Sequence, residues 1–378
     1  MPHWSVYTGN SEPHDGIDRL PAPPPWRAFD GEPVVPPPRD ADDEAAVSPD
    51  RVHRARSYVA TPESVQLVNA ALVLRRPLLV TGPPGTGKSS LAYAVARELG
   101  LGPVLRWNIT SRSALADGLY QYDPLSRLYA ARQAAWRERT ERTERTERTE
   151  RTERAGRSGA EETVEASGLP GARSIGLSGT EGVEDHLRLG PLGTALLPYD
   201  RPRALLVDEI DKSDLDLPND LLNVLEEGQY EIPELLRAAR RSAEDATAEV
   251  LADGSDTPVT VTRGRIRCRA FPFVVLTSNG EREFPPAFLR RCVRLKLRRP
   301  DREQLTEIVR AHLDTPPGEA EHLINRFLTR AADGELATDQ LLNALYLTGV
   351  AGLDADSRDA LAEQLMPYLS TTADGDGF

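Results

Sequence analysis

Residues 82–90 combine closely spaced glycines with a lysine and two serines. They fill the pattern G-x-x-x-x-G-K-[ST] without a gap. Glycines let the backbone curl so that successive N–H groups point at phosphate oxygens, while a lysine can reach the β- and γ-phosphates and a serine can ligate Mg²⁺. We therefore predict a phosphate-binding loop with Ser89 as a Mg²⁺ ligand, made by Gly82, Pro83, Pro84, Gly85, Thr86, Gly87, Lys88, Ser89 and Ser90.

The segments on either side of this loop are those that must position it. Residues 78–80 form a short apolar run typical of a strand buried on both faces. After the loop, Leu91, Val95 and Leu99 recur at helical spacing, and Gly100 provides a helix stop. The sequence predicts a strand, a loop and a helix whose positive end faces the phosphates.

Polar side chains also follow two further apolar runs. Asp208 and Glu209 come directly after residues 204–207, and Asn279 comes shortly after residues 273–276. Because strands alternate with helices, we expect a mostly parallel sheet whose carboxyl ends gather these residues beside Lys88. Asp208 is then placed to hold Mg²⁺ opposite Ser89, and Glu209 to orient and polarise the water that attacks the γ-phosphate.

Composition excludes several other classes of protein. A net charge of −13 argues against a general nucleic-acid surface, because phosphate neutralisation needs clustered Lys and Arg. The two cysteines do not form a C-x-x-C, and the six histidines are scattered, so neither a disulfide framework nor a zinc site is expected. No apolar run approaches the roughly 20 residues of a membrane span, and the N-terminus lacks a signal-peptide layout. We expect a cytoplasmic protein without membrane contact.

The chain divides into three parts by composition and periodicity. Residues 1–55 are rich in Pro, Asp and Glu and predict a disordered Pro-rich arm, in which Trp4 and Trp26 are docking points or stray aromatics. Residues 56–299 predict the α/β nucleotide-binding domain, with a helix that begins at Thr61 as N-cap and Pro62 as first residue. Residues 237–257 of this domain are polar and are expected to be loop-like. Within it, residues 137–185 hold a Glu-Arg-Thr repeat and a Gly- and Ser-rich stretch, which indicate an exposed low-complexity insertion. Glu and Arg residues four positions apart in the repeat could pair along a solvated helix: Glu138 with Arg142, Glu141 with Arg145 and Glu144 with Arg148. Residues 300–378 have helical periodicity throughout and predict four helices of a small all-α domain.

Four motifs together resemble the AAA+ ATPases, specifically the MoxR-like branch. They are residues 82–89, 207–212, 278–285 and 287–292. The resemblance implies a core of five parallel strands followed by an α-helical lid, and a ring, expected to be a homo-hexamer, with ATP and Mg²⁺ between neighbouring subunits. It also implies that Asp208 and Glu209 are the Walker B pair, that Asn279 is sensor 1, and that Arg291 or Arg290 is the arginine finger.

The resemblance also sets expectations about partners. It implies a remodelling chaperone acting on a protein client, often one with a von Willebrand factor A domain. Residues near 259–271 alternate as a hairpin would, with its turn at Arg263 and Gly264. This hairpin resembles the pre-sensor 1 insertion, and its basic residues are either client contacts or a solvated face: Arg263, Arg265, Arg267 and Arg269. The sequence departs from the family at the start of the third lid helix, where residues 337–340 hold no basic sensor 2 residue.

Two other functions remain open from the sequence. One is a nucleic-acid-processing motor or restriction-type nucleotidase, against which the acidic charge balance counts. The other is a nucleotide-dependent switch that turns over slowly, which the missing sensor 2 residue permits. Glu209 and Asn279 are both present and favour hydrolysis.

Overall fold

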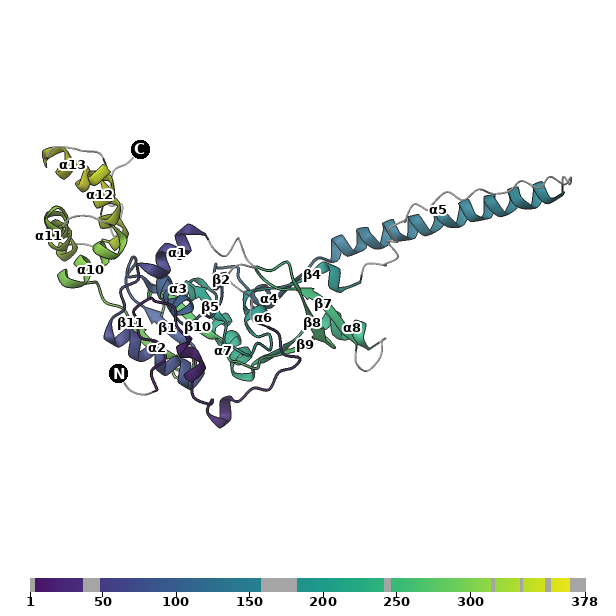
Figure 1. The fold of residues 1–378 in the computed structure, drawn as a ribbon, viewed down its shortest axis with the longest axis horizontal. Coiled ribbons are helices and arrows are strands. Elements are labelled where there is room, and N and C mark those ends of the chain that lie inside the picture. The colour runs from purple at the N-terminus through teal and green to yellow at the C-terminus, as the bar shows by residue number, and fades with distance from the viewer. Residues whose placement is uncertain are drawn as a thin grey trace.

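The computed structural model describes residues 4–36, 48–157, 182–240, 246–313, 317–333, 336–350 and 355–367. Its centre is a five-stranded sheet in the order β11-β1-β10-β5-β2, in which every neighbouring pair is parallel. The predicted α/β core of five parallel strands is thereby confirmed (Figure 1). The strands are β1 (Leu78–Thr81), β2 (Leu105–Asn108), β5 (Ala204–Asp208), β10 (Phe273–Ser278) and β11 (Val293–Lys296).

Side chains of the central strands alternate between two hydrophobic cores. In β5, Ala204 and Leu206 face one core, together with α2 (Pro62–Leu74) and α3 (Lys88–Glu98). Leu205 and Val207 face the other core, with α6 (Pro191–Ala195) and α7 (Leu217–Glu227). Alternate residues of a strand point to opposite faces, so a strand covered on both sides is apolar throughout.

The helix before the phosphate loop begins as predicted. Thr61 is the N-cap of α2, its side chain accepts a hydrogen bond from the Ser64 N–H, and Pro62 occupies the first turn. A proline is tolerated there because its missing N–H would have no partner within the helix. The helix ends at Leu74, and it packs against the same core as β1.

Residues 4–36 differ from the expected disordered arm, because they pack onto the core. Val6 and Tyr7 are buried against α2 and α3, and the Asn69 side chain bonds the backbone of both. The fully buried Glu98 carboxylate accepts N–H groups from Gly9 and Ser11. Composition indicated disorder, but these distant polar side chains satisfy the backbone of the segment. Residues 1–3 and 37–47 of the predicted arm lie outside the described residues.

The two tryptophans of this segment are placed differently. Trp4 is partly buried, whereas Trp26 is 76% exposed and lies in η2 (Pro25–Arg27), which follows η1 (Asp15–Arg19). Another helix of the predicted arm, α1 (Pro49–Arg56), begins at an N-cap, where Ser48 accepts the Arg51 N–H.

A second sheet, which the sequence did not predict, has the order β3-β4-β7-β8-β9-β6. Its hairpin between β8 (Pro258–Thr262) and β9 (Arg265–Arg267) turns at Arg263 and Gly264 as predicted, and both have positive φ. Residues 237–257, expected to be loop-like, instead include the end of α8 (Pro233–Ala239) and the strand β7 (Thr247–Leu251). Only Val250 of this strand is fully buried, and Thr247, Glu249 and Leu251 are exposed, so it lacks the continuous apolar run of a strand covered on both faces. The remaining strands are β3 (Tyr120–Tyr122), β4 (Leu187–Leu189) and β6 (Gln229–Glu231).

The predicted insertion at 137–185 begins within one long helix, α5 (Pro124–Arg157), which extends away from the body of the molecule on the side opposite the lid (Figure 1). Near its start, Leu125, Tyr129 and Trp136 are exposed. In the repeat, threonine hydroxyls donate to carbonyls four residues earlier, as in Thr140 to Trp136. The glutamate side chains of the predicted Glu–Arg pairs lie outside the described part of the structure. The Gly- and Ser-rich stretch at 158–181 also lies outside it.

Four helices follow the central sheet and have their own core, which confirms the predicted all-α lid. They are α10 (Arg302–His312), α11 (Pro317–Asp333), α12 (Thr338–Val350) and α13 (Ala355–Leu365). The short elements not yet mentioned are α4 (Leu115–Leu119), η4 (Glu184–His186), η5 (Ile210–Lys212) and α9 (Pro286–Leu289). Within the described residues, no helix is both long and apolar enough to cross a bilayer.

Candidate nucleotide site

The phosphate loop joins β1 to α3 and has the backbone that its glycines allow. Gly82, Gly85 and Gly87 have φ of 155°, 73° and 81°. The Thr86 hydroxyl donates to the Pro83 carbonyl at 2.9 Å and so closes the loop on itself. Gly87 is the N-cap of α3, which places the free N–H groups of that helix at the end of the loop.

Lys88 is the first residue of α3 and is buried. Its ammonium nitrogen donates to the carbonyl oxygens of Gly82 and Pro83, each at 2.8 Å. Burial lowers the pKa of Lys88, and the nearby carboxylates of Asp211, Asp208 and Glu209 act in the opposite direction. The lysine therefore lies where the loop and the acidic strand ends meet.

Asp208, at the end of β5, is the acceptor for three other elements. Its Oδ1 accepts from the hydroxyls of Ser89 and Thr277, both at 2.7 Å, and its Oδ2 lies 2.7 Å from Nη2 of Arg106 on β2. Burial acts to raise the pKa of Asp208, but hydrogen bonds from Ser89, Thr277 and Arg106 outweigh it and hold that pKa below its usual value. We refer to Asp208, Ser89, Thr277 and Arg106 as the carboxylate junction.

Glu209 follows Asp208 in a left-handed backbone conformation, with φ of 62° and ψ of 48°. A side chain in this region costs of order 1 kcal/mol, and such strain clusters at functional sites. The Glu209 N–H donates to Thr277 Oγ1 at 2.9 Å, which fixes the turn, and the Glu209 carboxylate pairs with Lys212 Nζ at 2.8 Å. The left-handed turn ends the strand direction at Glu209, and its half-exposed carboxylate lies next to the carboxylate junction.

Asn279 is joined to the acidic strand end by Asp211, a residue whose role the sequence analysis missed. Oδ2 of the buried Asp211 accepts the backbone N–H groups of Asn279, Gly280 and Glu281 at 3.0, 3.0 and 3.1 Å. This one oxygen holds the loop after β10 against the end of β5. The position within the Asp-Glu-Ile-Asp run was the only signal in the sequence that could have pointed to Asp211.

Arg290 and Arg291 interact with residues outside the carboxylate junction. Arg290 is exposed, and its carbonyl accepts a hydrogen bond from Arg76 Nη1 at 3.1 Å. Nε of Arg291 lies 3.1 Å from Oε1 of Glu226, at the end of α7. The fold therefore brings Lys88, Ser89, Asp208 and Glu209 together, whereas Arg291 is paired with a residue of α7.

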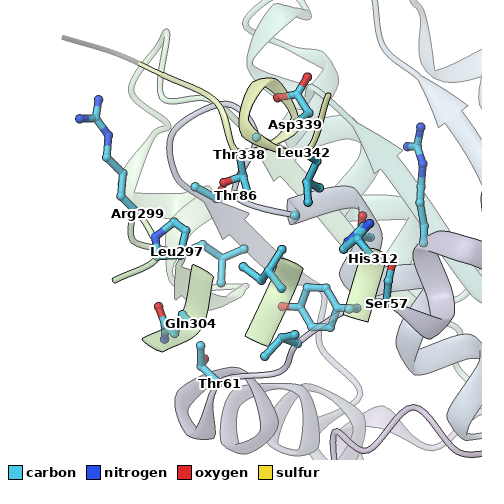
Figure 2. A pocket seen from close by; sticks show the side chains of 18 of the residues that line it. Ser57, Thr61, Thr86, Leu297, Arg299, Gln304, His312, Thr338, Asp339 and Leu342 are labelled. Carbon is cyan, nitrogen blue, oxygen red and sulfur yellow. The ribbon is translucent and has the colours of Figure 1, made fainter. Parts of the chain in front are cut away.

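A cavity of about 1240 Å³ adjoins the loop and reaches between α1, β11 and the lid (Figure 2). Its walls include Gly85, Thr86, Gly87 and Ser90 of the loop. Apolar and aromatic groups lie beside cations in the remaining wall, among them Tyr58, Leu297, Arg299, Ile308, His312 and Leu342. A cavity that combines a phosphate loop, apolar side chains and cations has the chemistry to enclose a nucleotide.

The start of the third lid helix, where the sequence lacks a basic residue, touches the loop directly. A Cβ added to Gly85 would lie 2.6 Å from Cβ of Ala337 and 2.8 Å from N of Thr338. Both lid residues are buried, and Thr338 and Asp339 line the cavity (Figure 2). Close backbone packing therefore connects the lid to the loop at this position.

The residues of the junction fit a Mg²⁺ ion that shares phosphate oxygens. Among the described residues, no group of three or more His, Cys, Asp and Glu side chains could hold a metal by itself. Magnesium usually binds through one or two carboxylates together with waters and substrate phosphates, so the Asp208 carboxylate and Ser89 hydroxyl suffice as protein ligands.

Cys268 and Cys292 are free thiols, and burial raises the pKa of each to about 12.

Comparison with known proteins supports a nucleotide-binding domain. Residues 78–133 match the family model of the ATPase family associated with various cellular activities (AAA). The match supports an AAA-type ATPase. It covers β1, the phosphate loop and α3, and it ends within α5. No curated protein matches the chain.

Among solved structures, the chain resembles NtrX from Brucella abortus in complex with ADP. The identity is 13% and the TM-score 0.36, over 84% of this chain and 56% of that one. The chain thus spans little more than half of the NtrX chain, and a likeness of this degree does not carry the function of NtrX to this chain.

Proposed function

We propose that this protein is an ATP-hydrolysing, MoxR-like AAA+ ATPase that binds ATP with Mg²⁺. The observation that carries the proposal is the carboxylate junction, in which the loop Ser89 and the strand residue Thr277 both donate to one oxygen of Asp208. The preference for ATP over GTP depends on the family resemblance alone.

The proposed reaction needs positioning and charge neutralisation more than covalent chemistry. Lys88 and the N–H groups of the loop would hold the phosphates, and Ser89 and Asp208 would hold Mg²⁺, which supplies further neutralisation of phosphate charge when bound. Glu209 would orient and polarise the attacking water, and the loop held by Asp211 would present Asn279 to that water.

We further propose that the active form is a ring, expected to be a homo-hexamer. Arg291, or the adjacent Arg290, would reach the γ-phosphate held by a neighbouring subunit. Arg291 is partly exposed, at 27%, so it is not sealed inside its own subunit. The work done by hydrolysis would be applied to a protein client, in this family often one with a von Willebrand factor A domain.

The basic hairpin is a weaker candidate for the client-binding surface than the sequence indicated. Three of its arginines form ion pairs within the chain, Arg265 with Glu231, Arg267 with Asp30 and Arg269 with Glu32. Two of these acidic partners come from the N-terminal segment. A client would have to compete with these pairs, so we place the client surface elsewhere on the ring.

The test compares steady-state ATPase activity and nucleotide binding of the wild type with those of Glu209→Gln. Loss of a charge that acts in the transition state should lower the rate at least ~100-fold while nucleotide binding is retained. Glu227→Gln, an exposed change on α7, is the matched control. Equal rates for Glu209→Gln and wild type would remove the catalytic role of Glu209.

A nucleotide-dependent switch with slow turnover is the second candidate, and one contact favours it. The Glu209 carboxylate is paired with Lys212 at 2.8 Å, and this pair occupies an oxygen that would otherwise accept a hydrogen bond from the attacking water. A wild-type enzyme that binds ATP tightly but turns it over no faster than Glu209→Gln would favour the switch.

A further inference from the structure

Arg291 shares its carboxylate partner with a second arginine from the N-terminal segment. Nη2 of Arg27 lies 3.7 Å from Oε1 of Glu226, the same oxygen that lies 3.1 Å from Nε of Arg291. Glu226 is at the end of α7 and is 35% exposed. One carboxylate oxygen therefore lies beside two cations that come from segments far apart in the sequence.

The two arginines differ in how firmly they are held. Arg27 is only 7% exposed, its Nη1 donates to the Leu225 carbonyl at 3.2 Å, and its guanidinium lies 5.8 Å from the ring centre of Phe271. Arg291 is 27% exposed, and Glu226 is its ion-pair partner within the described residues. Arg27 is thus fixed beside Glu226, whereas Arg291 can leave by breaking one ion pair.

We propose that Glu226 is a latch that retains Arg291 in the isolated subunit, and that Arg27 is the standby cation that stays with Glu226 when Arg291 leaves. Arg291 would leave toward an anionic triphosphate bound to a second copy of this chain. This inference rests on the shared site in the proposed function. In these terms Glu226 and Arg27 are positioning residues, and the N-terminal segment takes part in assembly of the site.

The physical reason is the cost of leaving a partly buried carboxylate without a cation. Removing one member of such a pair is expensive because the remaining charge has lost its partner. Arg27, already within 4 Å, reduces that cost and so makes the release of Arg291 easier. The Arg290 carbonyl accepts a hydrogen bond from Arg76 Nη1, so the backbone beside Arg291 can stay in place while the Arg291 side chain leaves.

The test measures ATPase rate per subunit as a function of protein concentration. Glu226→Gln should lower the concentration that gives half-maximal rate, by about two- to five-fold for a partly exposed ion pair. Arg27→Met should raise this concentration, because the Glu226 carboxylate would then lose its remaining cation when Arg291 leaves. The double variant should behave as Glu226→Gln, since Arg27 affects the release of Arg291 only through the Glu226 carboxylate. Glu227→Gln, the exposed neighbour, should match the wild type.

The latch predicts that the two single variants shift the half-maximal concentration in opposite directions and that the double variant loses the effect of Arg27→Met. A folding defect predicts neither result. If Arg27→Met merely unfolded the segment, adding Glu226→Gln would not restore the rate, and that outcome would overturn the role of Arg27. If Arg291→Ala is inactive but Glu226→Gln and Glu227→Gln share one half-maximal concentration, the shared site stands and the latch is wrong. If the rate is independent of protein concentration and Arg291→Ala is fully active, the shared site is wrong and the latch falls with it.

Discussion

The hydroxyl oxygen of Ser89 lies 2.7 Å from Oδ1 of Asp208, although 119 positions of the chain separate the two residues. One belongs to the first turn of α3 and the other to the end of β5. The parallel sheet brings both elements to the same edge, so a hydroxyl and a carboxylate face each other where Mg²⁺ and phosphate would bind.

Asp208→Asn should weaken nucleotide binding in a magnesium-dependent way. The change keeps the shape of the side chain but removes its charge, so the affinity for a fluorescent ADP should fall about tenfold or more with Mg²⁺, equivalent to at least ~1.4 kcal/mol. Without Mg²⁺ the affinity should stay within a factor of about two, because the phosphates still meet the loop. Asp220→Asn, on the exposed surface of α7, is the control. Equal losses with and without Mg²⁺ would contradict the metal role of Asp208.

Gly85→Ala should separate loop strain from lid contact. Gly85 and Gly100 both have positive φ, at 73° and 58°, so an alanine at either position should lower the free energy of unfolding by about 1 kcal/mol. An added Cβ meets Ala337 and Thr338 at Gly85 but nothing within 4 Å at Gly100. Only Gly85→Ala should therefore weaken nucleotide binding, by about tenfold or more. Similar dissociation constants for the two variants would mean that the lid contact does not shape the site.

Glu98→Ala should release the N-terminal segment. The fully buried carboxylate accepts several N–H groups of residues 8–11, and its loss leaves those donors without their partner at a cost of about 3 kcal/mol. The midpoint of thermal unfolding should fall, and limited proteolysis should cut residues 4–36 earlier than in the wild type. Glu12→Ala, an exposed change in the same segment, should leave both readouts unchanged. An unchanged proteolysis pattern in Glu98→Ala would show that the segment is held by other contacts.

The contact between α1 and the lid should depend on pH. Nε2 of His53 lies 3.0 Å from Nδ1 of His312 at the wall of the cavity, and burial, together with His53, lowers the pKa of His312 to about 4. Because this folded-state value is below the ordinary value near 6.5, the unfolded chain binds more protons between them. The contribution to stability is therefore complete above about pH 6.5 and is lost as the pH falls toward 4.

Thermal unfolding at a series of pH values checks this prediction. The wild type should lose stability between about pH 6.5 and 4, and His312→Gln should lose less over the same range. His322→Gln, an exposed change on α11, should keep the slope of the wild type. A slope that His312→Gln leaves unchanged would assign the pH dependence to other groups.

Local patterns in the sequence were enough to predict the elements that repeat a known physical period. The apolar runs at β1, β5 and β10 predicted strands buried on both faces, and Thr61 with Pro62 predicted the start of α2. These signals depend on neighbours within a few residues, so they can be recognised in the sequence without knowledge of the fold. β7 was missed because three of its five residues are exposed and only Val250 is fully buried, so it has no continuous apolar run.

The sequence by itself determined the phosphate loop, the acidic strand end and the class of the core, because each of these is set by residue types at fixed local spacing. Only the tertiary structure decided which distant side chains meet. Arg106 joins Asp208, Asp211 holds the Asn279 loop, and Arg27 joins Arg291 at Glu226. The packing of the N-terminal segment was also decided there, since its backbone groups are satisfied by Asn69 and Glu98 from far along the chain. Hydrogen bonds between distant residues leave no local periodic pattern, so they become visible only once the chain is folded.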